Sequence, residues 1–159
     1  MTRVLVAGVG NVFFGDDAFG VEVARQLALA PPPDAKVADF GIRARHLAFE
    51  LLTPFELCVV ADCMPRGGAP GTLYVVEPEL AEAAGSVADA HGMNLPVVFS
   101  AVRELGGTLP RTLIVGCEPE TIEPGMELSA SVSRAVPAAV DLILDLIRDL
   151  IPSASEASP

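Results

Sequence analysis

Short apolar runs alternate with longer amphipathic segments along almost the whole chain, and this alternation restricts the possible folds more than any other feature. The short runs are rich in Val, Leu and Ile, as in buried strands, and the longer segments repeat apolar residues at helical spacing. Strands that alternate with helices predict a parallel sheet with helices on both faces. We expect strands at 3–9, 35–40, 56–62, 71–77 and 111–118, and helices at 17–30, 45–52, 95–106 and about 129–150, the last with a kink or a late start at Pro137.

One connection is too short for a parallel crossover. Only the residues from Cys63 to Pro70 join the third expected strand to the fourth, whereas a crossover between parallel strands takes about a dozen residues or more. The fourth strand should therefore run antiparallel to the third. The predicted fold is a three-layer α/β/α sandwich around a five-stranded, mostly parallel twisted sheet with one antiparallel strand.

Composition limits the class of protein. The 159 residues, 51% of them hydrophobic, suit one globular domain at 1–152 followed by a flexible polar tail at 153–159. No apolar run approaches the roughly 20 residues that span a bilayer, and the N-terminus lacks a signal-peptide layout, so we expect a cytoplasmic protein without a membrane partner. A net charge of −11 excludes nucleic acid as a natural partner. Three cysteines without a CxxC pair predict neither disulfides nor structural zinc. For the oligomeric state, a monomer is the simplest expectation.

Three aspartates follow the expected strands at positions that point to a common site. Asp16 and Asp17 come after the first strand, and Asp62 ends the third. These strands are neighbours in the usual order of such sheets, and ligands bind beyond their carboxyl ends. We therefore expect the carboxylates to meet in one crevice. A turn-capping role for Asp62 and a helix N-capping role for Asp16 remain open as structural alternatives.

His91 is the candidate that completes this site. It lies in a loop of small residues, and the segment from Pro78 to Ala90 is long enough to carry it back to the carboxyl edge of the sheet. The other histidine, His46, lies in a helical pattern beside arginines and is expected at the surface. Two carboxylates and one imidazole suit a borderline divalent metal ion and leave positions open for water or substrate.

Two other interpretations of the first strand and the loop after it are each contradicted by a single residue position. A dinucleotide-binding loop would follow Gly8 and Gly10 with a third glycine at position 13, where Phe13 stands. A phospho-accepting receiver domain would carry a lysine near the end of the fifth strand. The only lysine of this chain is Lys36, at the start of the second strand.

Four sequence blocks resemble the hydrogenase maturation endopeptidases, the family that trims the C-terminal peptide from the large subunit of nickel–iron hydrogenases. The blocks occur in order and cover roughly residues 3–140: GVGNVFFGDDAFGVEVARQL, VVADCMPRGGAPGTLYVVE, DAHGMNL and IVGCEPETIEPGMELSASV. The resemblance implies a single α/β domain and a peptidase activity. It also implies that the substrate is the large-subunit precursor and that the precursor supplies the nickel, which the protease recognises before it cuts.

The resemblance places the metal-contacting residues of the family on Asp17, Asp62 and His91. Cys63 stands where family members commonly carry alanine, and Asn11 matches the family motif, where we expect it to hold the turn after the first strand. No serine or cysteine has the context of a nucleophile elbow, so covalent catalysis is not predicted. The alternative function is a non-catalytic metal-binding protein or metallochaperone that uses the same three ligands in hydrogenase assembly.

Overall fold

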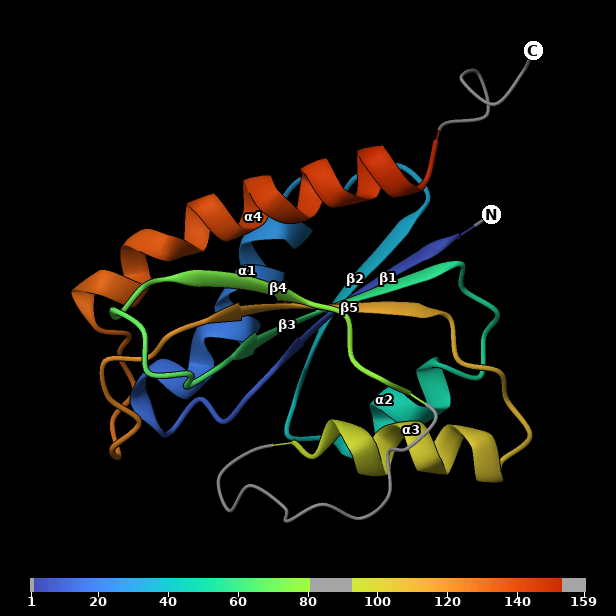
Figure 1. Cartoon of the computed structure of the whole chain (residues 1–159), viewed down its shortest axis with the longest axis horizontal. Helices are drawn as coiled ribbons and strands as arrows, with labels where there is room; N and C mark the ends of the chain where they lie inside the picture. Colours follow the sequence, from blue (N-terminus) through green and yellow to red (C-terminus); the bar gives the residue numbers. More distant parts are fainter. Residues whose placement is uncertain (1, 81–92, 153–159) are drawn as a thin grey trace.

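A five-stranded sheet runs through the middle of the molecule in the computed structural model, which describes residues 2–80 and 93–152 (Figure 1). Its strand order is β2-β1-β3-β5-β4, and the neighbours β2, β1, β3 and β5 are parallel. The predicted α/β/α sandwich is confirmed. The strands are β1 (Val4–Val9), β2 (Ala35–Gly41), β3 (Leu57–Cys63), β4 (Leu73–Val76) and β5 (Arg111–Cys117).

Helices cover both faces of the sheet. Figure 1 shows α1 (Phe19–Ala28) and α4 (Ala130–Leu150) on one side, and α2 (Ala44–Glu50) and α3 (Leu95–Glu104) on the other. Successive side chains of a strand point to opposite faces, so the apolar strands supply two separate cores. The core beneath α1 and α4 contains Val4, Val6, Phe19, Val59 and Ile143, and the core beneath α2 and α3 contains Leu5, Ala7, Leu47, Val60 and Val98.

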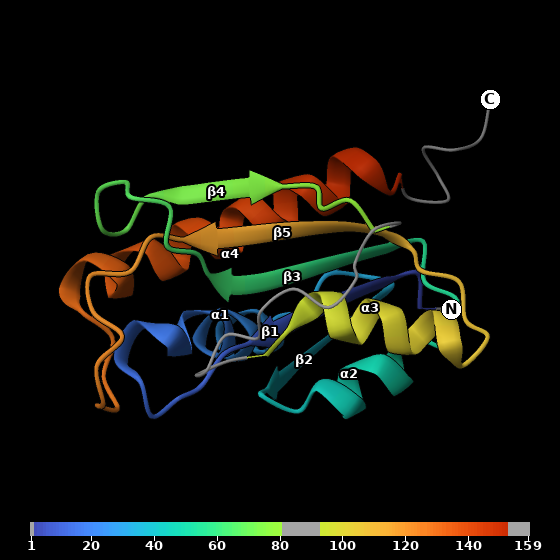
Figure 2. The same ribbon diagram turned by 60° about the horizontal axis from the view of Figure 1, so that its bottom comes forward.

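The edge strand β4 runs antiparallel to β5, with Leu73 opposite Cys117 (Figure 2). It therefore also runs opposite to β3, as the short connection after Cys63 predicted. The crossover that a parallel β4 would need is absent, so the chain turns back and pairs on the far side of β5 instead.

Helix α4 begins well ahead of Pro137, so the late start that we considered for this helix is wrong. Its N-cap is Ser129, whose hydroxyl accepts a hydrogen bond from the Val132 N–H at 3.4 Å. Pro137 lies inside the helix on an exposed position. Proline has no N–H to donate to the backbone carbonyl one turn earlier. Because this side of the helix is exposed, water can donate a hydrogen bond to that carbonyl instead. No helix in the described ranges combines the length and the apolar composition that a bilayer crossing requires.

Two glycines bring the backbone of α1 into direct contact with the sheet. A Cβ atom on Gly20 would lie 1.9 Å from the carbonyl oxygen of Ala61 and 2.4 Å from that of Val9, and one on Gly8 would lie 2.2 Å from the Gly20 oxygen. The helix therefore rests on both β1 and β3 without an intervening side chain. This contact holds the short 3-10 turn η1 (Gly15–Ala18), which precedes α1, against the end of β3.

We expect Gly20→Ala to lower the free energy of unfolding by about 1–3 kcal/mol, because the added methyl group overlaps two backbone carbonyls that cannot rotate away. Chemical denaturation of the purified protein measures this. Gly125→Ala is the matched control, since a Cβ there meets nothing closer than 3.9 Å. Equal stability of Gly20→Ala and the wild type would show that α1 can move off the sheet at little cost.

Candidate active site

The carboxyl ends of the four parallel strands lie together, at the left of Figure 2, and we call this end of the sheet its carboxyl edge. The turn after β1 places Asp17 at this edge, and the last residues of β3 place Asp62 there. In the parallel pairing of β1 with β3, Gly8 is opposite Ala61, the residue before Asp62. The predicted neighbourhood of the first and third strands is therefore confirmed, and it brings these two aspartates to adjacent strand ends.

Asp17 is held in place by the turn that follows β1. The residue is 7% exposed, and its carboxylate accepts a hydrogen bond from the Asn11 N–H at 2.9 Å. Gly10 adopts φ 132°, and a Cβ there would lie 1.8 Å from the Asp17 carbonyl oxygen, so only glycine fits. The Asn11 side chain accepts a hydrogen bond from the Phe13 N–H at 2.9 Å, which confirms its predicted role in the turn.

Cys63 marks the point at which the acidic residues gather. Burial is the largest cause of the raised pKa of its thiol. The charges of Asp17, Asp62 and Asp16 raise the pKa further, in decreasing order of effect. All three carboxylates therefore act on one half-buried sulfur at the end of β3. The thiol stays protonated at neutral pH, which is the opposite of what a nucleophilic cysteine requires.

Asp16 has a structural task that differs from that of its neighbour. It is fully buried, and its Oδ2 accepts hydrogen bonds from the Glu120 N–H at 2.8 Å, the Thr121 N–H at 3.1 Å and the Ser129 hydroxyl at 2.9 Å. Its Oδ1 accepts a fourth from the Ser129 N–H at 2.7 Å. Asp16 thus ties the segment 119–129 to the turn after β1. The N-cap alternative for Asp16 is wrong, because the helix that follows has no side-chain cap.

Glu118, directly after β5, fixes the loop between β3 and β4. It is 5% exposed, and its Oε1 accepts hydrogen bonds from the Tyr74 hydroxyl at 2.7 Å, the Arg66 N–H at 2.8 Å and the Gly68 N–H at 2.9 Å. The Tyr74 bond is the main cause that lowers the pKa of Glu118, and the backbone N–H groups add to it. Sequence reasoning missed this role, although a glutamate that directly follows the apolar run LIVGC is a signal for a buried partner.

The third predicted ligand, His91, lies outside the described residues. Within residues 2–80 and 93–152, no three His, Cys, Asp or Glu side chains are grouped to hold a metal ion. The proposed ligand set therefore depends on His91. His46 is exposed on α2, as predicted.

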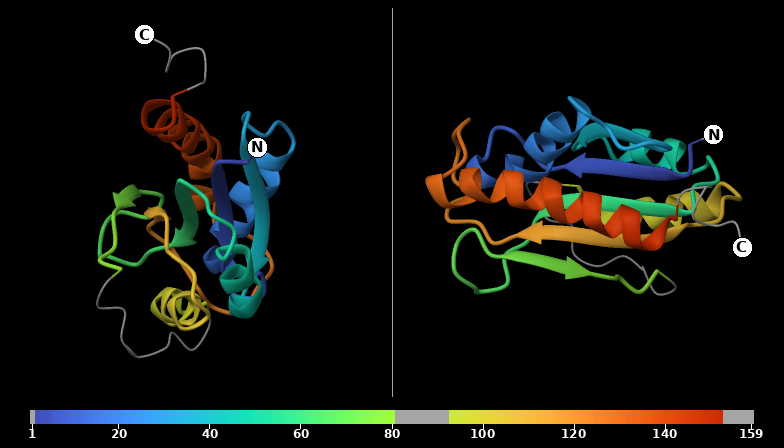
Figure 3. Two further views of the ribbon diagram at one scale, coloured as in Figure 1. Left: turned by 90° about the vertical axis from the view of Figure 1, so that its right-hand side faces the viewer. Right: turned by 90° about the horizontal axis from the view of Figure 1, so that it is seen from above.

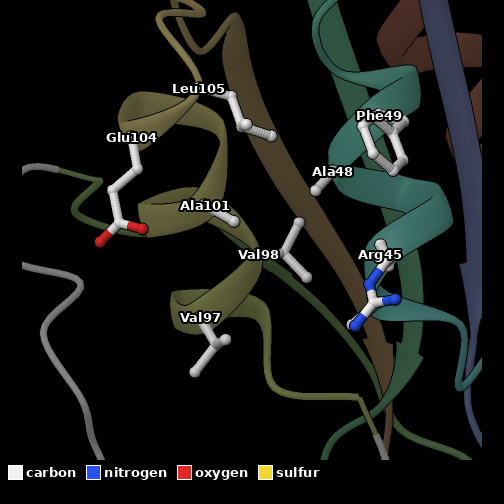
Figure 4. A pocket seen from close by; sticks show the side chains of 9 residues that line it. Arg45, Ala48, Phe49, Val97, Val98, Ala101, Glu104 and Leu105 are labelled. Carbon is white, nitrogen blue, oxygen red and sulfur yellow. The ribbon is translucent and has the colours of Figure 1, made fainter.

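Two of the hollows on the described part of the molecule differ in character. One of about 320 Å³ lies at the turn after β1, and its walls include Gly10, Asn11 and Arg43. The other, of about 500 Å³, lies between α2 and α3, where Val98 and Ala48 point into the gap (Figure 4). Only the first adjoins the backbone that positions a candidate ligand.

We expect Asp16→Asn to destabilise the protein by about 1–3 kcal/mol, because the amide NH₂ group must face at least one of the four donors and leave it without an acceptor. The free energy of unfolding from urea denaturation measures this. Asp34→Asn is the matched control, since Asp34 is exposed and asparagine tolerates its φ of 63°. A variant as stable as the control would refute the clamp role.

Glu118 gives a prediction about pH. Because the pKa of Glu118 is lowered in the folded protein, its ionised form stabilises the fold above its ordinary pKa of 4.5, and this contribution is lost as the pH falls through the folded pKa. The stability difference between wild type and Glu118→Gln should therefore shrink as the solution is acidified from pH 6 to pH 3. Urea denaturation at each pH measures it, with Glu104→Gln, an exposed glutamate of α3, as control. A constant difference would contradict the prediction.

Known proteins resemble this chain in sequence and structure. The family model of the hydrogenase maturation protease matches residues 21–146. The hydrogenase 2 maturation protease of Escherichia coli K12 is 29% identical over 133 residues, which are 82% of this chain and 81% of that protein. A putative hydrogenase maturation protease of Methanocaldococcus jannaschii is 30% identical over 131 residues, which are 77% and 83% of the two chains.

Solved structures agree with these relatives. The hydrogenase maturating endopeptidase HybD from Escherichia coli superposes with a TM-score of 0.79 at 26% identity and covers 93% of both chains. The hydrogenase maturation protease HycI from Thermococcus kodakarensis gives a TM-score of 0.74 at 28% identity, over 92% of this chain and 93% of its own. The matched residues include most of α1, the end of β3 and the segment before α4 that Asp16 binds. The chain therefore belongs to the hydrogenase maturation protease family, as its sequence blocks predicted.

Proposed function

We propose that this protein is an endopeptidase that removes the C-terminal extension of a nickel-loaded hydrogenase large-subunit precursor. Asp17, Asp62 and His91 are the residues that bind the nickel carried by the precursor. The single observation that supports this best is the convergence of Asp17 and Asp62 beside Cys63 at the carboxyl ends of adjacent parallel strands. Membership of the protease family supports the peptidase activity.

The chemistry of the three side chains suits this role. Two carboxylate oxygens and one imidazole nitrogen are ligands that a borderline divalent ion accepts, and three protein ligands leave room for groups of the precursor. The ion arrives as part of the substrate. A precursor without nickel lacks the group that these side chains bind, so it is not positioned for cleavage.

The geometry also restricts how the peptide bond is cut. The Cys63 thiol is kept protonated by burial and by the surrounding carboxylates, so it does not serve as a nucleophile. We propose that water hydrolyses the bond while Asp17 and Asp62 hold the ion and, through it, the precursor. Asp17 contributes a fixed position, since the Asn11 N–H holds its carboxylate in the turn.

Single variants of the ligands test the proposal. In a strain that lacks the endogenous enzyme, Asp17→Ala, Asp62→Ala and His91→Ala should each leave the precursor unprocessed. The loss of activity should exceed the roughly 10–100-fold that follows removal of a residue that only supports a metal ligand. Precursor length on gels or by mass spectrometry measures processing. Asp34→Asn and His46→Ala are matched controls on the exposed surface. Full processing by all three ligand variants would refute the metal-docking role.

A turnover assay separates the protease from the metallochaperone alternative. Purified protein is mixed with an excess of nickel-loaded precursor, and the precursor mass is followed with time. A protease shortens many precursor molecules per chain, whereas a chaperone acts stoichiometrically and leaves its partner uncut. The same assay with Asp62→Asn separates two roles of the ion, provided that this variant still cuts. A raised KM at unchanged kcat indicates that the ion serves for recognition, and a lowered kcat indicates a part in the chemical step.

A further inference from the structure

Exposed apolar side chains gather at the same edge of the sheet as the carboxylates. Phe13 is 60% exposed, Ile122 41% and Met126 71%. They lie on two loops that run side by side, the turn after β1 and the segment before α4, as Figures 1 to 3 agree. Single exposed apolar residues are ordinary, whereas three on two adjoining loops make this end of the molecule a candidate interaction surface.

The two loops are joined by backbone hydrogen bonds. The Gly125 N–H donates to the Phe13 carbonyl at 2.9 Å, and the Gly15 N–H donates to the Gly125 carbonyl at 2.8 Å. The Asp16 carboxylate fastens the same segment at Glu120, Thr121 and Ser129. The exposed apolar side chains are therefore carried by a preformed surface, which lowers the entropic cost of binding a partner.

Charge indicates what kind of partner fits. Glu120, Glu123 and Glu127 are exposed and alternate with Ile122 and Met126 along the segment. No lysine or arginine occurs between Arg111 and Arg134 in the sequence. The complementary surface is an apolar patch bordered by lysine or arginine.

The surface adjoins the turn after β1 that holds Asp17. A hollow of about 150 Å³ lies against α1 between the two loops, and its lining includes Val12, Arg25 and Met126. Val12 also lines the larger hollow that reaches Gly10 and Asn11. The Asn11 N–H in turn holds the Asp17 carboxylate. A partner that covers this surface therefore reaches the turn that holds the Asp17 carboxylate.

We propose that this surface, which we call the docking rim and define by Phe13, Ile122, Glu123, Met126 and Glu127, binds the folded body of the large-subunit precursor. The inference rests on the proposed function. The folded body fits better than the extension alone because Asp17 is almost fully buried and Asp62 is half-buried. For an ion that sits in the folded precursor to reach these recessed ligands, the precursor surface around it must approach the carboxyl ends of the strands, where the rim also lies.

The test compares rim variants with matched variants at the opposite edge of the sheet. The double variant Phe13→Ser and Met126→Ser should raise the KM for nickel-loaded precursor about 10-fold or more, with kcat unchanged at saturation, because buried apolar anchors dominate interface energetics. Glu123→Lys with Glu127→Lys should raise KM as well and reverse its dependence on salt. Leu29→Ser and Glu104→Lys, both at exposed positions near the other edge, are the controls and should leave KM unchanged.

The outcomes separate this inference from the proposed function. If the wild type cleaves the precursor and the rim variants, folded by circular dichroism, cleave it with unchanged KM, the docking rim is refuted while the proposed function stands. If the wild type neither binds nor cleaves the precursor, the proposed function fails first. A synthetic peptide of the extension that competes with the precursor for wild type but not for the rim variants would show that the rim binds the extension, which contradicts the inference.

Discussion

The carboxylate of Asp16 accepts four hydrogen bonds from a segment more than a hundred residues away in the sequence, and the organisation of the whole carboxyl edge depends on it. A buried carboxylate without partners is costly, but four donors, two of them on the residue that caps α4, compensate for lost hydration. Its neighbour Asp17 instead accepts a hydrogen bond from the Asn11 N–H within the turn after β1. Two adjacent aspartates thus carry two different tasks, one in holding the loops and one at the candidate site.

The concentration of acidic groups at this edge has an energetic consequence. Asp16, Asp17 and Asp62 all act electrostatically on the Cys63 sulfur, so their charges lie near the end of β3. Like charges that lie near one another repel, and a divalent cation bound between them offsets this repulsion. In the proposed function this cation belongs to the substrate. The repulsion in the free enzyme then becomes a source of affinity for a precursor that carries nickel.

The sequence predicts the sheet well because its evidence is local. Strand length, helical spacing and the short connection after Cys63 are all properties of neighbouring residues, and the parallel order of β1 and β3 follows from common topology. The roles of Asp16 and Glu118 could not be predicted in the same way, because their partners are remote in sequence and are mostly backbone N–H groups, which carry no residue-specific signal. Pro137 shows a further limit, since a solvent-facing helix position tolerates a residue that local propensity disfavours. The assignment of His91 stays a prediction from the sequence.

An ion site and a docking rim would each be insufficient for selective processing. Carboxylates that bind a divalent ion do not by themselves distinguish the precursor from other sources of metal, and an apolar rim alone would hold loaded and unloaded precursors equally. When both contacts are made by one partner, the second forms at the high effective concentration that the first creates, so the gain in affinity exceeds that of either contact alone. This coupling requires a fixed geometry between rim and ligands. The Asp16 clamp and the Asn11 turn supply it, since they join the loop segment before α4, the exposed apolar residues and the Asp17 carboxylate into one hydrogen-bonded unit.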